Sequence, residues 1–216
     1  MLVISTERSE WRNLDNMFWQ QVHQLDQHIS LAINNCHSSF TDPIWMFFSD
    51  KLVWIPMYVG IIALLFWKLG WKKALIVLAG VLLTFGFCDQ FSNLIKHAVG
   101  RIRPVNDEYM VASGLHILER GGGFSFFSAH AANALGLAFS SYIGLRTYLR
   151  DKKQKAPWWI KAYGSWMFFW AAMVGISRVF VGRHYLGDVL VGFIVGAAAG
   201  IAFGYLATYL IRKFIK

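Results

Sequence analysis

The chain has 216 residues, of which 56% are apolar and only 15% are charged, and its mean hydropathy is +0.42. Soluble globular domains carry about 25% charged residues, so this composition excludes an ordinary soluble domain and predicts that most of the chain lies in lipid. The 21 Lys and Arg against 12 Asp and Glu give a formal charge of +9. Such an excess suits nucleic acid, a membrane surface or an anionic substrate, and the position of the charges must decide among them.

Residues 1–43 are predicted to form an N-terminal amphipathic segment. Its first residues are charged and lack an apolar run, so no cleavable signal peptide is expected. In residues 14–33, apolar side chains recur at three- and four-residue steps, at Leu14, Phe18, Val22, Leu25, Ile29 and Ile33. The opposite face is polar but lacks the Lys and Arg that favour lipid headgroups. Packing of this helix against the rest of the protein is therefore favoured over a position on the bilayer surface.

Residues 44–216 are predicted to form a membrane-embedded domain. Five apolar stretches each approach the roughly 20 residues needed to cross about 30 Å of hydrocarbon. They run over residues 52–67, 74–95, 129–149, 157–176 and 189–211. The first is short, and residues 44–48 are a candidate extension at the membrane interface. The predicted fold is an all-α integral membrane protein with a bundle of five transmembrane helices plus the N-terminal amphipathic helix.

The charges divide between the two sides of this predicted bundle. One side, formed by the loops after the first and third spans and by the C-terminal tail, carries twelve Lys and Arg but a single acid, Asp151. Its cations are Lys68, Lys72, Lys73, Arg146, Arg150, Lys152, Lys153, Lys155, Lys161, Arg212, Lys213 and Lys216. The positive-inside rule makes this side, including the C-terminus, cytoplasmic in a multi-pass inner (plasma) membrane protein. The basic excess is then a topology signal, and no nucleic-acid partner is expected.

Three polar clusters interrupt the apolar pattern, and the predicted topology brings all of them to the extracytoplasmic face. The first lies at the end of the second span, the second at the start of the third span, and the third between the last two spans. They contain Lys96, Arg101 and Arg103; then Ser128, Ala129 and His130; then Arg178, Arg183, His184 and Asp188. Segments far apart in the sequence are therefore expected to converge at one site.

Cations beside two histidines suit a phosphate ester, because phosphoryl transfer depends on positioning and on neutralising the phosphate oxygens. Ser128 and the amides after it open a predicted helix, whose unpaired N–H groups attract anions. His184 and Asp188 are about one helical turn apart, so the carboxylate can hold one ring nitrogen and leave the other as nucleophile. His130 remains as the general acid. No carboxylate or Cys/His set has metal-ligand spacing, so neither a metal nor another cofactor is predicted.

Asp89 is a polar residue inside a predicted span. It lies two turns before Lys96 on the same helical face. An acid within a span is a functional candidate by default, but a structural pair with a neighbouring cation is the favoured interpretation. Cys36 and Cys88 are too few for a disulfide framework and are interpreted as free thiols.

The polar clusters form an ordered series of motifs. Lys96 is followed after six residues by Arg103-Pro104, then come Ser128-Ala129-His130, then Ser177-Arg178 followed after five residues by His184 and after three more by Asp188. This series resembles the three-part signature of the type 2 phosphatidic acid phosphatase family, whose superfamily also includes vanadium haloperoxidases and glucose-6-phosphatase. The resemblance covers about residues 40–216, and ordered motifs of this length are far more specific than a lone short motif.

The resemblance implies a helical bundle with a phosphate pocket at the membrane surface, a phosphohistidine intermediate and no metal requirement. The residues it assigns to phosphate binding are Lys96, Arg103, Ser128, Ala129 and Arg178. It assigns the nucleophile to His184, the orienting carboxylate to Asp188 and the general acid to His130. Phe127 and Ala129 replace the usual Pro and Gly of the middle motif, and the methyl group of Ala129 restricts the backbone there. The family core is described with six helices, and the N-terminal amphipathic segment is a candidate for the sixth.

The leading functional hypothesis is an integral membrane lipid phosphatase, a metal-independent hydrolase acting on a lipid phosphate or diphosphate at the extracytoplasmic face. A site at the membrane rim receives a tethered headgroup already oriented. The resemblance offers undecaprenyl diphosphate, phosphatidylglycerol phosphate, phosphatidic acid and the phosphates of lipid A as substrates. A vanadate-dependent haloperoxidase is a second possibility, which the spans disfavour. An anion channel or transporter is a third, and the chain lacks the duplicated halves typical of transporters.

Overall fold

The computed structural model describes the backbone of residues 3–152 and 157–215, and this part of the chain contains helices and no β-strand. The elements in chain order are α1 (Val3–Asn34), α2 (Asp42–Ser49), η1 (Leu52–Trp54), α3 (Ile55–Val99), η2 (Pro104–Asn106), α4 (Glu108–Ala112), α5 (Ala129–Lys152), α6 (Trp158–Phe180) and α7 (Leu186–Phe214). The predicted all-α class is confirmed. Three of the predicted cytoplasmic cations, Lys153, Lys155 and Lys216, lie outside the described residues.

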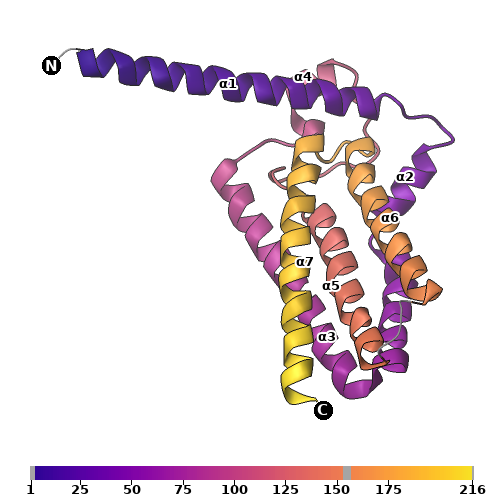
Figure 1. The fold of residues 1–216 in the computed structure, drawn as a ribbon. Helices are drawn as coiled ribbons and strands as arrows, with labels where there is room; N and C mark the ends of the chain where they lie inside the picture. The colour runs from indigo at the N-terminus through magenta and orange to yellow at the C-terminus, as the bar shows by residue number, and fades with distance from the viewer. Residues whose placement is uncertain (1–2, 153–156, 216) are drawn as a thin grey trace.

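Four long helices form an upright bundle, with α1 laid across its upper end and the C-terminus at its lower end (Figure 1). Helix α3 is divided at Gly70, whose φ of 73° and ψ of 163° are non-helical. Only glycine reaches such angles easily, so the chain turns there between two limbs. The five predicted spans correspond to these two limbs and to α5, α6 and α7. Among the described residues, the segments Leu52–Val99 and Leu186–Phe214 are long and apolar enough to cross a membrane.

Helices α5 and α7 approach each other unusually closely. Glycines recur every four residues on α7, and each faces the backbone of α5. A Cβ added at Gly196 would lie 2.1 Å from the Ala132 carbonyl oxygen, and one at Gly192 would lie 2.5 Å from the Ser128 carbonyl oxygen. Small residues at such a seam are typical of membrane helices, because they allow backbones to pack directly. The seam fixes the start of α5, with the second predicted motif, beside the start of α7, with the third.

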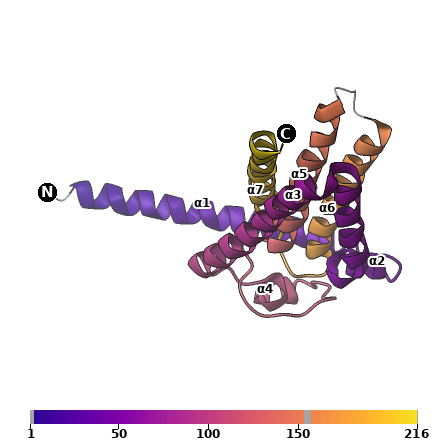
Figure 2. The same ribbon diagram turned by 90° about the horizontal axis from the view of Figure 1, so that it is seen from below.

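Helix α1 packs against the bundle, as favoured, but through its polar face. Gln27, Ser30 and Asn34 are buried. Phe18, Leu25 and other apolar side chains of the helix are exposed, at 56% and 60% for these two. Its N-terminal part projects beyond the bundle in both views (Figure 2). The periodicity identified the helix, whereas the orientation is opposite to the one a soluble amphipathic helix adopts, because the bundle end on which it lies is itself polar.

Residues 44–48 do not extend the first span. They belong to the separate helix α2, which ends at Ser49. Asp50 then interrupts the helix, and its Oδ1 accepts a hydrogen bond of 2.8 Å from the Leu52 amide at the start of η1. This local bond favours a turn over helix continuation. The turn brings Ser49 and Lys51 to the polar end of the bundle.

Candidate active site

A cavity of about 690 Å³ lies between α2, α3, α5 and α6. At one end, residues from all three predicted clusters line it together: Lys96, Arg103, Ala129, His130, Arg178, Arg183 and His184. They come from the end of α3, the loop after it, the start of α5, the end of α6 and the loop before α7. The expected convergence of distant segments is therefore present.

His184 and Asp188 form a buried pair at this end. The Nδ1 atom of His184 lies 3.4 Å from Oδ2 of Asp188, and their side chains are 2% and 0% exposed. The same carboxylate accepts a 3.1 Å hydrogen bond from the Tyr185 amide, a bond from the Ser125 hydroxyl, and a 2.7 Å charge-assisted bond from Arg101. Since Nδ1 faces Asp188, Nε2 is the ring nitrogen available for reaction.

Burial and nearby cations keep the His184 imidazole neutral. Burial is the larger cause and, with the positive charges of Arg178 and Arg103, it lowers the pKa of His184 to about 4, although Asp188 opposes the shift. At neutral pH the ring therefore carries a free electron pair, which a nucleophile needs. The carboxylate is in place to stabilise positive charge that develops on the ring during reaction.

Three arginines with unused donors surround the cavity. The side chain of Arg178 is only 2% exposed, and its guanidinium donates to Glu119 at 3.1 Å and to the Ser49 hydroxyl. Arg183 lies 3.5 Å from the same carboxylate. The Nε atoms of Arg103, Arg178 and Arg183 are all buried without a hydrogen-bond partner among the described residues. Buried unpaired donors are costly, so this arrangement favours an anion between them.

The mutual repulsion of these cations affects their ionisation. Burial and the charges of Arg183 and Arg178 lower the pKa of Arg103 to about 10. Burial alone would raise the pKa of Glu119, but the charge and hydrogen bond of Arg178 outweigh it and hold that pKa below its usual value. One carboxylate therefore offsets part of the positive charge and leaves a net excess for an anionic ligand.

The residues of the middle motif, Ser128, Ala129 and His130, differ in what they contact. Ala129 lines the cavity, and His130 follows it in the first turn of α5. Ser128 is fully buried and does not line the cavity; its amide donates to the Asp188 carbonyl oxygen at 3.0 Å, and its hydroxyl accepts from the Ala131 amide at 3.4 Å. Ser128 thus caps α5 and joins it to α7, so its predicted contact with phosphate stays a prediction.

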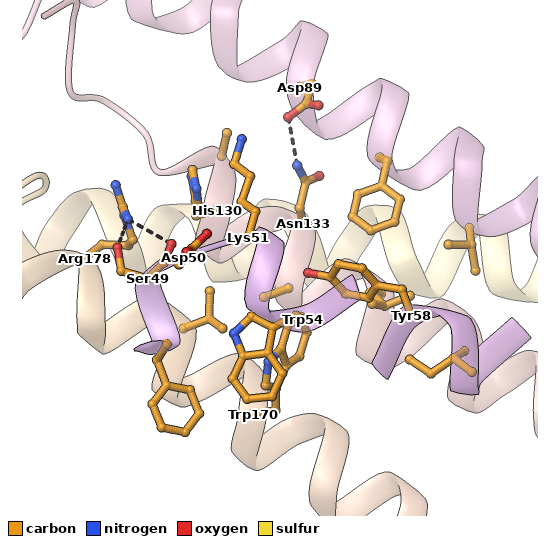
Figure 3. Close-up of a pocket in the computed structure, with 18 of the residues that line it drawn as sticks. Ser49, Asp50, Lys51, Trp54, Tyr58, Asp89, His130, Asn133, Trp170 and Arg178 are labelled. Carbon is orange, nitrogen blue, oxygen red and sulfur yellow. Dashed lines mark hydrogen bonds between the residues drawn. The ribbon is translucent and has the colours of Figure 1, made fainter. Parts of the chain in front are cut away.

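The other end of the cavity is apolar. Its wall is built by η1, the two limbs of α3, α5 and α6, and includes Trp54, Ile61, Leu65, Leu78, Val81, Leu137, Trp170 and Val174. Trp54 and Trp170 contact each other edge to face, with ring centroids 5.7 Å apart, below the polar groups in Figure 3. A continuous cavity with a cationic end and an apolar end suits an amphiphilic anion.

The matches to known proteins agree with this architecture. Residues 73–212 match the model of the PAP2 superfamily. The chain belongs to the PAP2 superfamily. A relative from Bacteroides thetaiotaomicron named lipid A 4'-phosphatase is 36% identical over 192 residues, covering 88% of this chain and 80% of that protein. A lipid A 4'-phosphatase from Porphyromonas gingivalis is 27% identical over 186 residues, covering 84% and 72%.

Two solved structures share the PAP2 fold of this chain. The transmembrane PAP2-type phosphatidylglycerolphosphate phosphatase from Bacillus subtilis superposes with a TM-score of 0.66 at 24% identity, covering 91% of this chain and 89% of that one. Aquifex aeolicus LpxE superposes with a TM-score of 0.56 at 18% identity, covering 82% and 92%. At these identities the likeness shows the fold alone. The family and its relatives together support the general kind of protein predicted, a membrane lipid phosphatase.

Several residues of this PAP2 site lie outside the predicted set. Glu119 and Ser49 hold Arg178, and Lys51 extends beside His130 at the cavity (Figure 3). None stands in a motif, so spacing gave no signal for them. Asp89 accepts a 2.8 Å hydrogen bond from Asn133, and both line the cavity. The hydrogen-bond partner of Asp89 is therefore an amide of α5, and its favoured pairing with a cation stays a prediction.

One group outside the PAP2 cavity has the composition of a metal site. His37, Asp42 and His116 have ligand atoms within 4.8 Å of one another, a cluster that the sequence did not reveal because the histidines are distant in the chain. The two rings stack at 3.6 Å with an interplanar angle of 4°. Ligand electron pairs lie in the ring planes, so in this arrangement they do not converge on one ion. The 2.9 Å contact between His116 and Asp42 instead ties the loop before α5 to α2.

Proposed function

We propose that the chain hydrolyses the phosphate of a membrane lipid, with lipid A phosphate as the favoured substrate. The observation that carries the proposal is the single cavity that joins the cationic end, with His130 and His184, to the apolar wall. An acyl chain suits the apolar wall and a phosphate suits the cationic end. Two relatives named lipid A 4'-phosphatase support this substrate over undecaprenyl diphosphate, phosphatidylglycerol phosphate or phosphatidic acid.

The proposed reaction has two steps. The Nε2 electron pair of His184 attacks phosphorus, the bond from phosphorus to the lipid oxygen breaks, and His130 gives that oxygen a proton. Water then attacks the phosphohistidine, His130 takes its proton, and phosphate leaves with the bond electrons returned to His184. Asp188 stabilises the imidazolium character of His184 in both steps.

Cations of the protein supply the charge neutralisation in this mechanism. Lys96, Arg103 and Arg178 bind the phosphate oxygens, and the Ala129 amide assists at the start of α5. A metal ion is therefore not required. We expect turnover in the presence of EDTA and inhibition by vanadate, whose trigonal form mimics the transferring phosphoryl group. Loss of turnover on chelation, restored by a divalent cation, would contradict this mechanism.

The site is proposed to face the extracytoplasmic side. The end of α5, the start of α6 and the end of α7, which carry cations, lie at the opposite end of the bundle from the start of α5, where His130 lies (Figure 1). Cys36 is exposed near the polar end and offers a native probe. An impermeant maleimide should label Cys36 on intact cells, whereas Lys72→Cys in a Cys36→Ser background should react only after permeabilisation. The reverse pattern would invert the topology.

A substrate panel tests the activity itself. Detergent-solubilised protein is offered lipid A, phosphatidic acid, phosphatidylglycerol phosphate and undecaprenyl diphosphate, and released phosphate is measured. We expect the highest kcat/KM with lipid A and none with the His184→Ala control. Release without any membrane gradient would also separate an enzyme from an anion carrier. A higher kcat/KM for another lipid would overturn the substrate, and no release from any of them would overturn the function.

A further inference from the structure

Helix α1 caps the helix that carries Asp188. The first amides of any helix lack partners within it. In α7 the Leu186 amide donates to the Ser30 hydroxyl at 2.8 Å, and the Gly187 amide donates to Oδ1 of Asp26, also at 2.8 Å. A Cβ at Gly187 would lie 2.7 Å from Oδ2 of Asp26, so a larger residue there would displace the Asp26 carboxylate. The N-terminus of α7 is thus held by a helix more than 150 residues earlier in the chain.

The same carboxylate connects to the catalytic pair through an arginine. Oδ2 of Asp26 lies 2.7 Å from Nη2 of Arg101, and Nη1 of Arg101 lies 2.7 Å from Oδ1 of Asp188. Nη2 also lies 3.1 Å from Nδ1 of His23, and the guanidinium stacks 3.8 Å from the centre of the Tyr185 ring. The Arg101 side chain is 15% exposed. Contacts of both Nη atoms and of the face against Tyr185 leave this guanidinium little freedom to move.

Arg101 differs in this respect from the other cations of the site. It is not among the residues that line the cavity. Its charge is matched by two carboxylates, while Arg103, Arg178 and Arg183 line the cavity and have Nε donors without a partner among the described residues. Arg101 therefore serves Asp188 rather than phosphate, and the charge of Asp26 limits how strongly it attracts the Asp188 carboxylate.

We propose that Asp26 is a positioning residue of the active site, acting through Arg101 to set the orientation and charge of Asp188 and thereby the reactivity of His184. The proposal rests on the proposed function, since it assumes His184 as nucleophile. Under this proposal, α1 contributes a residue that supports the active site. Ser30 assists by fixing the first turn of α7 without contributing charge.

The charges around His184 predict the direction in which each substitution shifts its pKa. Several elements contribute charged and titratable groups near His184: Asp188, Arg178, His130, Lys96, Arg101, Arg103 and Arg183, with Glu119 and Lys51 behind them and with His23 and Asp26 of α1 against Arg101. Against this constant background, loss of the Arg101 charge leaves Asp26 unopposed and raises the pKa of His184. Loss of the Asp26 charge lowers it, and loss of both restores the balance.

The test measures kcat/KM from pH 3.5 to 8 for wild type, Arg101→Gln, Asp26→Asn and the double variant. The acidic limb of this profile, where kcat/KM falls as the nucleophile is protonated, reports the pKa of His184 in the free enzyme. All variants are compared on the same substrate, so the ionisation of the substrate contributes equally to every profile. We expect Arg101→Gln to move the limb up by about one pH unit, the order typical of one nearby charge. Asp26→Asn should move it down, and the double variant should return it toward wild type. A limb in the double variant equal to that of Arg101→Gln would overturn the proposal.

Two variants separate positioning from mere stability. Ser30→Ala removes a cap of α7 and the 3.4 Å hydrogen bond from Ser30 to Oδ1 of Asp26, but it keeps the Asp26 charge. Gln27→Ala removes a 2.9 Å bond from α1 to Asp107. Both should lower the unfolding temperature in detergent and leave the acidic limb in place. A shift in either comparable to that of Asp26→Asn would assign the effect to loosened packing and overturn the proposal. Turnover by His184→Ala would instead refute the proposed function, whatever the Asp26 variants show.

Discussion

The two ends of the cavity are built by different rules. The polar end uses single residues from the ends of α3, α5 and α6 and from the loops beside them, and some of these have defined partners, as Arg178 has Glu119 and His184 has Asp188. The apolar end is a surface of many hydrocarbon side chains along the helix interiors. Charge and hydrogen-bond geometry are lost when one partner changes, whereas apolar contacts are numerous and individually weak. Single substitutions at the polar end should therefore lower the rate of the reaction. Substitutions at the apolar end should change which substrates bind, through the shape of the cavity.

The largest effect is expected at the nucleophile. His184→Ala should lower kcat by about 10⁴-fold or more, since removal of a covalent nucleophile leaves only binding and electrostatic stabilisation. It should also abolish any acid-labile phosphoenzyme. Phosphate release and trapping of radiolabelled enzyme measure both effects. An acid-labile phosphohistidine trapped in this variant would assign the nucleophile to another histidine.

His130→Ala tests whether His130 acts as the general acid, separately from the nucleophile. General acid catalysis is worth about 10²- to 10⁴-fold, and a good leaving group hardly needs it. We expect a loss of that size on an alkyl lipid phosphate and a much smaller loss on an aryl phosphate, compared as kcat on the two substrates. Asp188→Asn provides the control, because it should affect both substrates alike. Equal losses on both substrates in His130→Ala would remove the acid role.

At the apolar end, narrowing the cavity should alter substrate selection and leave the chemistry intact. Val81 lines the cavity and is 6% exposed, whereas Leu83 on the same helix is 51% exposed and lies outside it. Val81→Phe should raise KM for a long-chain lipid phosphate about tenfold, which corresponds to about 1.4 kcal/mol, and change kcat on a short soluble ester little. Leu83→Phe is the matched control. Equal effects of Val81→Phe on both substrates would show that acyl chains do not occupy this end.

A separate effect is expected on the pH dependence of stability rather than on turnover, and only the polar end should produce it. His184 is buried neutral with its pKa lowered to about 4, so the unfolded chain binds its proton at higher pH than the folded one. Stability from this group is present above about pH 6.5 and is lost as pH falls toward 4, by up to about 3 kcal/mol. Thermal unfolding in detergent should show a shallower loss over this range in His184→Gln than in wild type. Val81→Phe should follow wild type, and a wild-type slope in His184→Gln would contradict the buried neutral imidazole.

The sequence by itself determined the helical bundle and most of the polar end. Apolar runs long enough to cross lipid admit few alternatives to helices, because backbone groups in a membrane must bond within their own segment. The sequence predicted that five residues of the polar end lie together, because their motifs have fixed spacing and fall on one predicted membrane face. These residues are Lys96, Arg103, His130, Arg178 and His184.

Only the tertiary structure decided how that end is supported. Periodicity identified α1 but could not say which face meets the protein, because beside a bilayer an apolar face is as well placed outward as inward. Asp26 with Arg101 and Glu119 with Arg178 pair across 75 and 59 residues, and such pairs have no periodic signal. Ser128 stood in a motif yet gives its amide to α7. A motif fixes which groups are near the reaction, while the partner of each group depends on how separate helices pack, and that is a property of the assembled chain alone.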